Sequence, residues 1–291
     1  MRGAPDQDRG ADAQENHQET AGQEQETKSQ GQGLTVARRI VRIHDGRAAE
    51  CEDILAVERT ITVVAGGEPF LRLQCLPEKV EELALGLLLS SGLLPPSAPP
   101  PPVGFDEASG EVRVDLSPDP DAVTALRQAM TLGSGCGAAL SAAGPFDPLA
   151  CSRRIDTGFA IEPSAVIEAM SAFVRRSELF KATGGVHAAA IASGSDIVAF
   201  AEDVGRHNAF DKVIGACYRQ GIELMDKIAL ATGRLSVELV AKAIPVSLPL
   251  VASRSAPTSA AADLADEANL TLVGFVRAGR MNVYTHPWRV R

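Results

Sequence analysis

The sequence has few aromatic residues, no bilayer-length apolar run and no excess of positive charge. Phe, Trp and Tyr make up 4% of the 291 residues, so few side chains can stack on nucleic-acid bases. The formal net charge is −9, which does not suit a nucleic-acid backbone. The apolar stretch at 83–94 is interrupted by glycine and serine, so no transmembrane helix is expected. These features argue against a general nucleic-acid binder and against a membrane protein.

Paired cysteines and several catalytic fingerprints are also missing. The five cysteines (Cys51, Cys75, Cys136, Cys151 and Cys217) lack the spacing of zinc ligands. No phosphate-binding Walker loop, dinucleotide fingerprint or serine nucleophile elbow is present. His187 is followed by alanine instead of the glutamate of zinc deaminases. These absences exclude a hydrolytic deaminase and predict neither zinc nor any other bound metal. The polar N-terminus is no secretory signal, so we expect a cytoplasmic protein with reduced thiols.

The composition divides the chain into four regions. Residues 1–33 carry seven acidic and three basic residues, hence −4 of the −9 total, and are expected to form a disordered tail. Residues 34–130 predict a small α+β domain with strands near 36–43, 54–57, 60–64, 70–76 and 111–116 and a helix from about Pro77. A stiff Pro-rich connector lies at 95–102. Cys51, Cys75 and Cys217 lie in apolar patterns that predict core positions.

Residues 131–152 form a third region that is rich in glycine, alanine and serine. Cys136 lies between Gly135 and Gly137. Flanking glycines remove steric shielding and let backbone N–H groups approach the sulfur, which favours the thiolate. A loop of this kind is either functional or merely flexible with an incidental thiol. Cys136 is therefore the candidate nucleophile, with both alternatives open.

Residues 153–291 alternate between helical and strand patterns. Helices are predicted from Pro163, from Asn208, from about Leu235 and over 257–268. Strands are predicted at 186–192, 197–201, 227–232, 246–252, 271–276 and 281–285. Alternation of this kind is typical of a layered α/β domain with a largely parallel or mixed sheet.

Polar corners follow several of these predicted strands. The first contains Arg206, His207 and Asn208, where Asp203 or Asn208 could cap the next helix. The others contain Arg234 with Ser236 and Glu238; Ser255, Thr258 and Ser259; and Arg277, Ala278, Gly279 and Arg280. Corners at the carboxyl ends of neighbouring strands share one crevice, where arginines, hydroxyls and helix N-termini suit a phosphorylated or nucleotide-bearing ligand. The alternatives are surface ion pairs for each arginine and a half-buried structural role for His207.

These stretches together resemble the FdhD family of formate dehydrogenase accessory sulfurtransferases, from about residue 36 to the C-terminus. The matches are Glu52-Asp53-Ile54, Glu82-Leu83-Ala84-Leu85-Gly86, Thr183-Gly184-Gly185-Val186-His187, Glu202-Asp203-Val204-Gly205-Arg206-His207-Asn208-Ala209, Asp211-Lys212-Val213-Ile214-Gly215, Gly233-Arg234, Ser255-Ala256-Pro257-Thr258-Ser259 and Gly274-Phe275-Val276-Arg277 with Gly279-Arg280. The resemblance implies an α+β protein with a cytidine-deaminase-like C-terminal α/β domain, forming a homodimer.

The resemblance also implies an activity. Such proteins accept sulfur from a cysteine desulfurase as a cysteine persulfide and pass it to the bis-guanine-dinucleotide molybdenum cofactor before formate dehydrogenase receives that cofactor. The nucleotide ends would occupy the crevice, with Phe275, Val276, Arg277, Ala278, Gly279 and Arg280 at the binding site. His187, Arg206, His207, Asn208, Arg234, Ser255, Thr258 and Ser259 are the further candidates.

One departure from the family concerns the sulfur-carrying cysteine. It is commonly the first of a Cys-Gly-x-Cys pair; Cys136-Gly137 matches, but Ala139 stands at the second cysteine. Sulfur exchange requires one nucleophilic thiol, so Cys136 retains the essential part. Two hypotheses follow: a sulfur carrier acting through Cys136, and a non-enzymatic chaperone that holds the cofactor without transferring sulfur.

Overall fold

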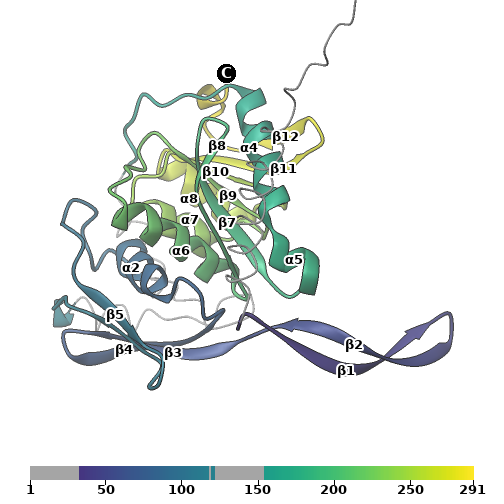
Figure 1. The fold of residues 1–291 in the computed structure, drawn as a ribbon. Coiled ribbons are helices and arrows are strands. Elements are labelled where there is room, and N and C mark those ends of the chain that lie inside the picture. Colours follow the sequence, from purple (N-terminus) through teal and green to yellow (C-terminus); the bar gives the residue numbers. More distant parts are fainter. Residues whose placement is uncertain (1–32, 118, 122–153) are drawn as a thin grey trace, which may run out of the picture. The chain divides into compact units, whose positions relative to one another are not determined.

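The computed structural model describes residues 33–117, 119–121 and 154–291, which form two compact units, Met1–Val57 and Glu58–Arg291 (Figure 1). Each unit is considered by itself. The predictions for residues 1–32 and for the segment 131–152, including Cys136 and Cys151, fall outside the described residues.

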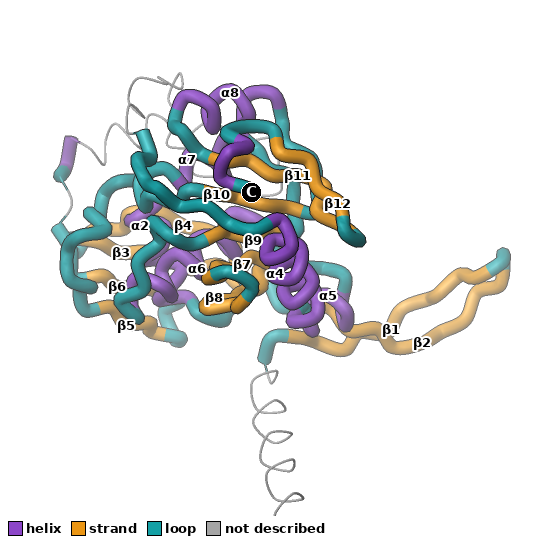
Figure 2. The backbone as a smooth tube through the Cα atoms, turned by 90° about the horizontal axis from the view of Figure 1, so that it is seen from above, coloured by secondary structure: helices purple, strands orange, loops and turns teal. Residues whose placement is uncertain are grey.

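The described part of the first unit is one long hairpin (Figure 2). Strand β1 (Thr35–His44) pairs antiparallel with β2 (Arg47–Ala56) along its whole length. Asp45 and Gly46 connect them with φ angles of 50° and 74°, as a tight turn that matches the twist of the strands requires. This Asp-Gly turn extends the second strand back to Arg47, well before the predicted 54–57. Cys51 is only partly buried on β2, so its predicted core position is wrong: a two-stranded hairpin has no second layer to cover it.

A four-stranded sheet opens the second unit. Its order is β4-β3-β6-β5, with β3 at Arg59–Ala65, β4 at Glu68–Cys75, β5 at Val103–Asp106 and β6 at Glu111–Val114. Strand β5 follows the Pro-rich stretch and was not predicted. Helix α2 (Val80–Ser90) starts three residues later than expected. Its leucines share one hydrophobic core with Ile61, Val63 and Val112 of the sheet.

Two glycines let α2 approach helix α6 (Arg206–Arg219) so closely that the backbones of the two helices are in contact. A Cβ atom on Gly86 would lie 1.8 Å from the backbone oxygen of Asp211. A Cβ on Gly215 would lie 1.9 Å from the backbone oxygen of Glu82. Only glycine fits at both points, because the obstructing atoms are backbone atoms that cannot rotate away.

The large sheet has the order β12-β11-β10-β9-β7-β8. Its strands are β7 (His187–Ser193), β8 (Asp196–Asp203), β9 (Ile228–Ala231), β10 (Leu250–Ser253), β11 (Thr271–Arg277) and β12 (Arg280–Val283). Strands β9, β10 and β11 are mutually parallel, whereas β7 is antiparallel to both β8 and β9, and β12 is antiparallel to β11. The sheet is mixed, one of the two arrangements predicted.

Helices cover both faces of this sheet (Figure 1). Helix α4 (Pro163–Arg176) packs Val166, Met170 and Phe173 in one core with Ala188 and Ala190. On the opposite face, Ala189 and Ile191 share the other core with α6, α7 (Val237–Ala243) and α8 (Ser259–Glu267). Alternate residues of β7 thus point to opposite faces of the sheet and pack in different cores.

The fold is a mixed α+β architecture, as the resemblance implies; the cytidine-deaminase-like detail stays a prediction. The helix predicted from Pro163 ends at Arg176, and the short α5 (Glu178–Thr183) follows it. A short 3-10 helix (Pro287–Arg289) lies near the C-terminus. Within the described part of the chain, no helix is long and apolar enough to cross a membrane.

Candidate functional site

The predicted polar corners lie at one end of the large sheet. Because β7 is antiparallel to both of its neighbours, β8, β9, β10 and β11 all point the same way. The segments that follow these four strands therefore leave the sheet at a common end. Strands β7 and β12 start there as well, since His187 is opposite Asp203 and Arg280 is opposite Arg277.

Hydrogen bonds between main-chain atoms join the corners. The N–H of Leu235 donates to the carbonyl of Ala256 (3.1 Å), and the N–H of Thr258 donates back to Leu235 (3.0 Å). The N–H of Phe275 donates to the carbonyl of Ser255 at 3.1 Å. These bonds hold three corners in a fixed relation, so side chains on them are preorganised for a ligand.

Buried residues stabilise the first corner. The Asp203 carboxylate forms an ion pair with Lys212 at 2.6 Å, and both side chains are fully buried. Asp203 also accepts hydrogen bonds from the N–H of Leu76 (3.1 Å) and of Gly205 (2.9 Å). Two charged side chains and two main-chain N–H groups are thereby satisfied, at a position where an unpaired charge would be costly.

Helix α6 starts at Arg206 with Gly205 at its N-cap and no side-chain cap, so the predicted capping by Asp203 or Asn208 is wrong. The Asn208 amide donates to Gln74 O at 2.8 Å and to Asp203 Oδ1 at 2.9 Å. Both amide hydrogens are therefore used inside the protein. Asn208, a predicted ligand-binding residue, supports the corner in this structure.

Two histidines face hydroxyl groups at this sheet end. His207 Nε2 lies 3.4 Å from Ser236 Oγ, and His187 Nδ1 lies 3.5 Å from Thr232 Oγ1. Burial, together with Lys242, Arg206 and His187, lowers the pKa of His207 to about 3. Burial and Arg206 also lower the pKa of His187, although Asp203 opposes them. Both imidazoles are therefore uncharged at neutral pH and act through hydrogen bonds instead of charge.

Arg206 lies against the backbone at Gly233. A Cβ atom on Gly233 would come within 3.0 Å of Arg206 Cδ and 3.6 Å of His187 Nδ1. The bare backbone at Gly233 thus lets Arg206, which starts α6, and His187, which starts β7, lie close to each other.

A second buried ion pair, between Lys242 and Asp211, acts on His207, because the charge of Lys242 contributes to the lowered pKa of that histidine. Lys242 Nζ contacts Asp211 Oδ2 at 2.7 Å, and Ser90 Oγ donates to Asp211 Oδ1 at 2.7 Å. Burial raises the pKa of Asp211, and Lys242 opposes that shift. Lys242 was not predicted as a site residue; its position between Leu239 and Ala243 of one apolar helix was the available signal.

The serine- and threonine-rich corner has mainly structural hydrogen bonds. Thr258 Oγ1 accepts a bond from the N–H of Ala261 (3.3 Å) and so caps α8. Ser253, which the sequence analysis did not select, donates to Gly233 O at 2.6 Å and accepts from the N–H of Ser255 at 3.0 Å. Ser255 is partly buried and Ser259 is exposed, so their side chains remain the accessible hydroxyls of this corner.

Strained backbone marks the last corner. Phe275, Ala278 and Gly279 have φ angles of 54°, 41° and 81°, and the β11–β12 pairing is irregular between Gly274 and Arg277. Positive φ in a residue as bulky as Phe is a rare conformation that often occurs at functional sites. Val276 is 1% exposed, so its side chain belongs to the core.

Four arginine side chains are exposed around this sheet end. Arg234, Arg277 and Arg280 were predicted, whereas Arg254 was not, although it directly follows the apolar strand β10. Arg277 Nε donates to the carbonyl of Arg254 at 3.1 Å. Exposed guanidinium groups at one end of a sheet can bind several oxygens of a phosphate chain.

Neither buried thiol is a candidate nucleophile. Burial raises the pKa of Cys75 to about 12, with a further contribution from Asp203, and burial raises the pKa of Cys217 to about 12. Both were correctly predicted to lie in the core. Their thiols are almost completely protonated at neutral pH and are weak nucleophiles.

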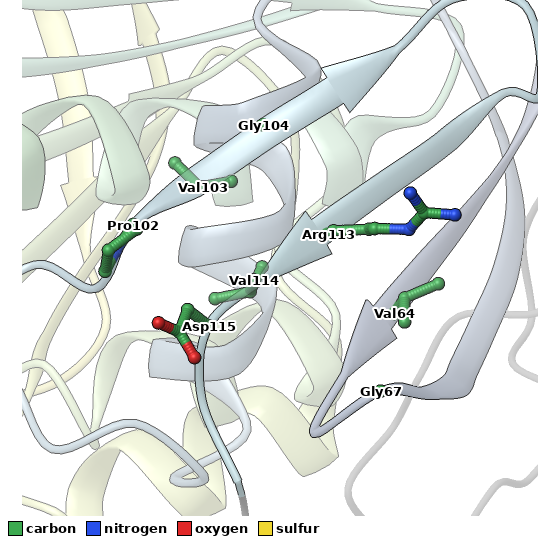
Figure 3. Close-up of a pocket in the computed structure, with 8 residues that line it drawn as sticks. All are labelled: Val64, Gly67, Pro102, Val103, Gly104, Arg113, Val114 and Asp115. Carbon is green, nitrogen blue, oxygen red and sulfur yellow. The ribbon is translucent and has the colours of Figure 1, made fainter.

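Neither a metal-binding cluster nor the hollow on the four-stranded sheet provides an alternative site in the described residues. No group of His, Cys, Asp and Glu in the described ranges could hold a metal ion. A hollow of about 450 Å³ lies on the four-stranded sheet, and Figure 3 shows Val103, Val114 and Asp115 among its lining side chains. None of the predicted ligand-binding residues lines this hollow.

The shifted pKa of His207 predicts how stability depends on pH. As pH falls below about 6.5, the unfolded chain protonates this ring, but the folded protein does so only near pH 3. The stability that His207 contributes is thus complete above pH 6.5 and is lost as pH falls toward 3, at up to about 1.4 kcal/mol per pH unit. Urea unfolding of wild type and His207→Gln between pH 7 and pH 4.5 should show a shallower decline in the variant; parallel curves would refute the prediction.

Comparisons with known proteins agree with this geometry and these motifs. The chain is 35% identical over 258 residues to "Sulfur carrier protein FdhD" of Bacillus subtilis (strain 168), which covers 89% of this chain and 98% of the relative. It is 32% identical over 257 residues to the protein of the same name from Staphylococcus aureus (strain Newman), covering 88% and 97%.

A solved structure has the same fold. The crystal structure of a putative formate dehydrogenase accessory protein from Desulfotalea psychrophila matches with a TM-score of 0.73 and 22% identity, covering 89% of this chain and all of the other. The profile of the FdhD/NarQ family matches residues 56–291. With two relatives above 30% identity along most of their length, the chain belongs to the FdhD/NarQ family.

Proposed function

We propose that this protein is a sulfur carrier for a molybdenum enzyme. It would receive sulfur from a cysteine desulfurase and deliver it to the bis-guanine-dinucleotide molybdenum cofactor, which is the cargo, before formate dehydrogenase takes up that cofactor. We further propose that it acts as a cytoplasmic homodimer. The observation that carries the proposal is the convergence of four polar strand-end corners at one end of the large sheet. The names of the relatives support the sulfur-carrying part.

The exposed arginines are the groups proposed to hold the cofactor's phosphates. Arg234, Arg254, Arg277 and Arg280 surround the sheet end on three separate corners. Their fixed positive charge and multiple donors fit a pyrophosphate linkage, whose oxygens accept hydrogen bonds from several directions. The hydrogen bond from Arg277 Nε to the carbonyl of Arg254 (3.1 Å) joins the β11–β12 turn, which is flanked by two of these arginines, to the corner after β10.

Cys136 is the proposed sulfur-carrying residue. Two of the five thiols are unsuitable as the sulfur-carrying nucleophile, because burial raises the pKa of Cys75 and of Cys217 to about 12. In the proposed step, the Cys136 thiolate attacks the outer sulfur of the desulfurase persulfide. The donor's S–S bond breaks, the donor leaves as a thiolate, and Cys136 becomes a persulfide without any net oxidation.

Release of the sulfur as hydrosulfide requires a second thiol, because the outer sulfur of the persulfide must gain two electrons. Attack by that thiol on the Cys136 sulfur would expel hydrosulfide and leave a disulfide, so the two electrons come from the pair of thiols. The family's usual second cysteine is Ala139 here. This protein would therefore use Cys151 or a small-molecule thiol, and the rate of sulfur release should depend on added thiol if Cys151 does not serve.

Ala139 also favours a second candidate function, a chaperone that binds the nucleotide cofactor but transfers no sulfur. The two functions differ in the requirement for Cys136. For a chaperone, Cys136→Ala would still activate formate dehydrogenase, whereas Arg206→Ala or Arg280→Ala would abolish activation. For a carrier, all three variants would be inactive.

The decisive experiment is intact-mass spectrometry after incubation with a cysteine desulfurase and cysteine. We expect the wild-type protein to gain one sulfur atom that cyanide removes, and Cys136→Ala to gain none. Cys51→Ala is the matched control, because Cys51 is a partly exposed thiol of the hairpin; this variant should gain sulfur normally. If wild type gains no sulfur, the carrier function is wrong and the chaperone is favoured.

A further inference from the structure

His187 combines partial exposure with one ring nitrogen that the protein does not use. It begins β7 at the end of the sheet where the polar corners lie, and its side chain is half-buried. Its Nδ1 faces Thr232 Oγ1 at 3.5 Å. Among the described residues, no group forms a hydrogen bond with its Nε2. A partly exposed ring nitrogen of this kind is available to a ligand.

The hydrogen bonds of Thr232 determine what that nitrogen can do. Thr232 Oγ1 accepts from the N–H of Ala188 at 3.0 Å and directs its own hydrogen to Ala188 O at 3.3 Å. A hydroxyl has one hydrogen and two lone pairs, so only a lone pair remains for His187. With the hydroxyl hydrogen directed to Ala188 O, His187 carries its own hydrogen on Nδ1, which leaves Nε2 as an acceptor.

Burial is the main reason why the ring of His187 stays neutral. Burial lowers the pKa of His187, Arg206, which lies against Gly233, lowers it further, and Asp203 acts in the opposite direction. His207, which also lies near, is itself uncharged at neutral pH. A neutral acceptor suits an N–H donor, but the oxygens of a pyrophosphate linkage carry negative charge and no hydrogen.

We propose that Nε2 of His187 accepts a hydrogen bond from the N–H edge of a purine base, and so makes His187 a specificity-determining residue of the crevice. The inference rests on the proposed function, in which a guanine nucleotide occupies this crevice. Phosphate binding and base recognition are then separate: the exposed arginines hold the phosphates, and His187 contacts the base. Thr232 is the positioning residue that fixes the tautomer of His187.

Isothermal titration of GDP and of inorganic pyrophosphate at pH 7.5 tests this division. His187→Ala should weaken GDP binding by about tenfold, the value of one hydrogen bond in a partly enclosed site, and leave pyrophosphate binding unchanged. His187→Gln, whose amide oxygen is also an acceptor, should recover part of the loss. His44→Ala is the matched control, because His44 lies on the hairpin and its side chain is 87% exposed; it should bind both ligands as wild type does.

A modified nucleotide tests which N–H group of the base donates to His187. Methylation of N1 of the guanine base removes an N–H donor and should lower affinity for wild type more than for His187→Ala. Thr232→Val should reduce the preference for GDP over pyrophosphate, because His187 is still present but its tautomer is no longer fixed by the hydroxyl group. Thermal melting of each variant verifies that it is folded.

The outcomes separate the two proposals. Equal affinity of wild type and His187→Ala for GDP, or an equal loss of GDP and pyrophosphate binding, would overturn the role of His187 alone. Failure of the wild-type protein to bind GDP at all would count against the nucleotide-binding part of the proposed function, and the role of His187 would be rejected with it.

Discussion

Gly215→Ala is expected to destabilise the protein by about 3 kcal/mol or more, and Gly86→Ala by a similar amount. A Cβ at position 215 would lie 1.9 Å from Glu82 O and 2.9 Å from Gly86 N. Both are backbone atoms of α2, so the overlap is relieved only by moving the whole helix. A loss of this size is a large fraction of the 5–15 kcal/mol that stabilises a typical domain.

Urea unfolding followed by far-UV circular dichroism measures this effect. Gly158→Ala is the matched control, because a Cβ at that exposed position would meet no atom within 4 Å; its stability should stay within about 0.5 kcal/mol of wild type. A Gly215→Ala protein with unchanged unfolding midpoint would show that α2 and α6 do not approach as closely as described.

Lys212→Met is expected to cost about 3–5 kcal/mol, because it leaves the carboxylate of Asp203 buried without its partner. The pair is 2.6 Å apart, and both side chains are 0% exposed. Lys212 Nζ also donates to Leu76 O at 3.0 Å and to Glu202 O at 3.2 Å, so these acceptors would lose a hydrogen bond as well. The substitution should disorder the first corner together with the histidine that follows it.

The double variant Asp203→Asn/Lys212→Met separates the cost of an unpaired buried charge from the other effects of losing Lys212. Removal of both charges should be less harmful than removal of the lysine alone, since no charge is left unpaired. Equilibrium unfolding of the two single variants and the double variant gives the coupling free energy. Additive losses in the three proteins would contradict a direct interaction between the two residues.

The strand-to-helix corner after β8 illustrates which roles the motif itself could not reveal. Its sequence of Glu, Asp, Gly, Arg, His and Asn suggested a ligand-binding corner with a side-chain cap. In the structure, Asp203 and Asn208 form hydrogen bonds that hold the corner itself, whereas Arg206 and His207 lie close to residues of the corner after β9. A short motif does not distinguish these roles, because they depend on partners more than 120 residues away, such as Leu76 and Gln74.

The sequence by itself determined the alternation of strands and helices, the core positions of Cys75 and Cys217, and the polar corners that follow apolar strands. These features depend on local periodicity and composition, which each segment carries independently of its neighbours. The motifs that mark the FdhD/NarQ family are equally local, and they are sufficient to assign the family.

Only the tertiary structure decided which corners meet and which glycines are indispensable. The direction of β7 between β8 and β9 places His187 beside Thr232 and Arg206. Gly86 and Gly215 are separated by more than 120 positions, and their close approach follows from the crossing of two helices. Strand order and helix crossing arise from contacts distant in sequence, so no local pattern encodes them.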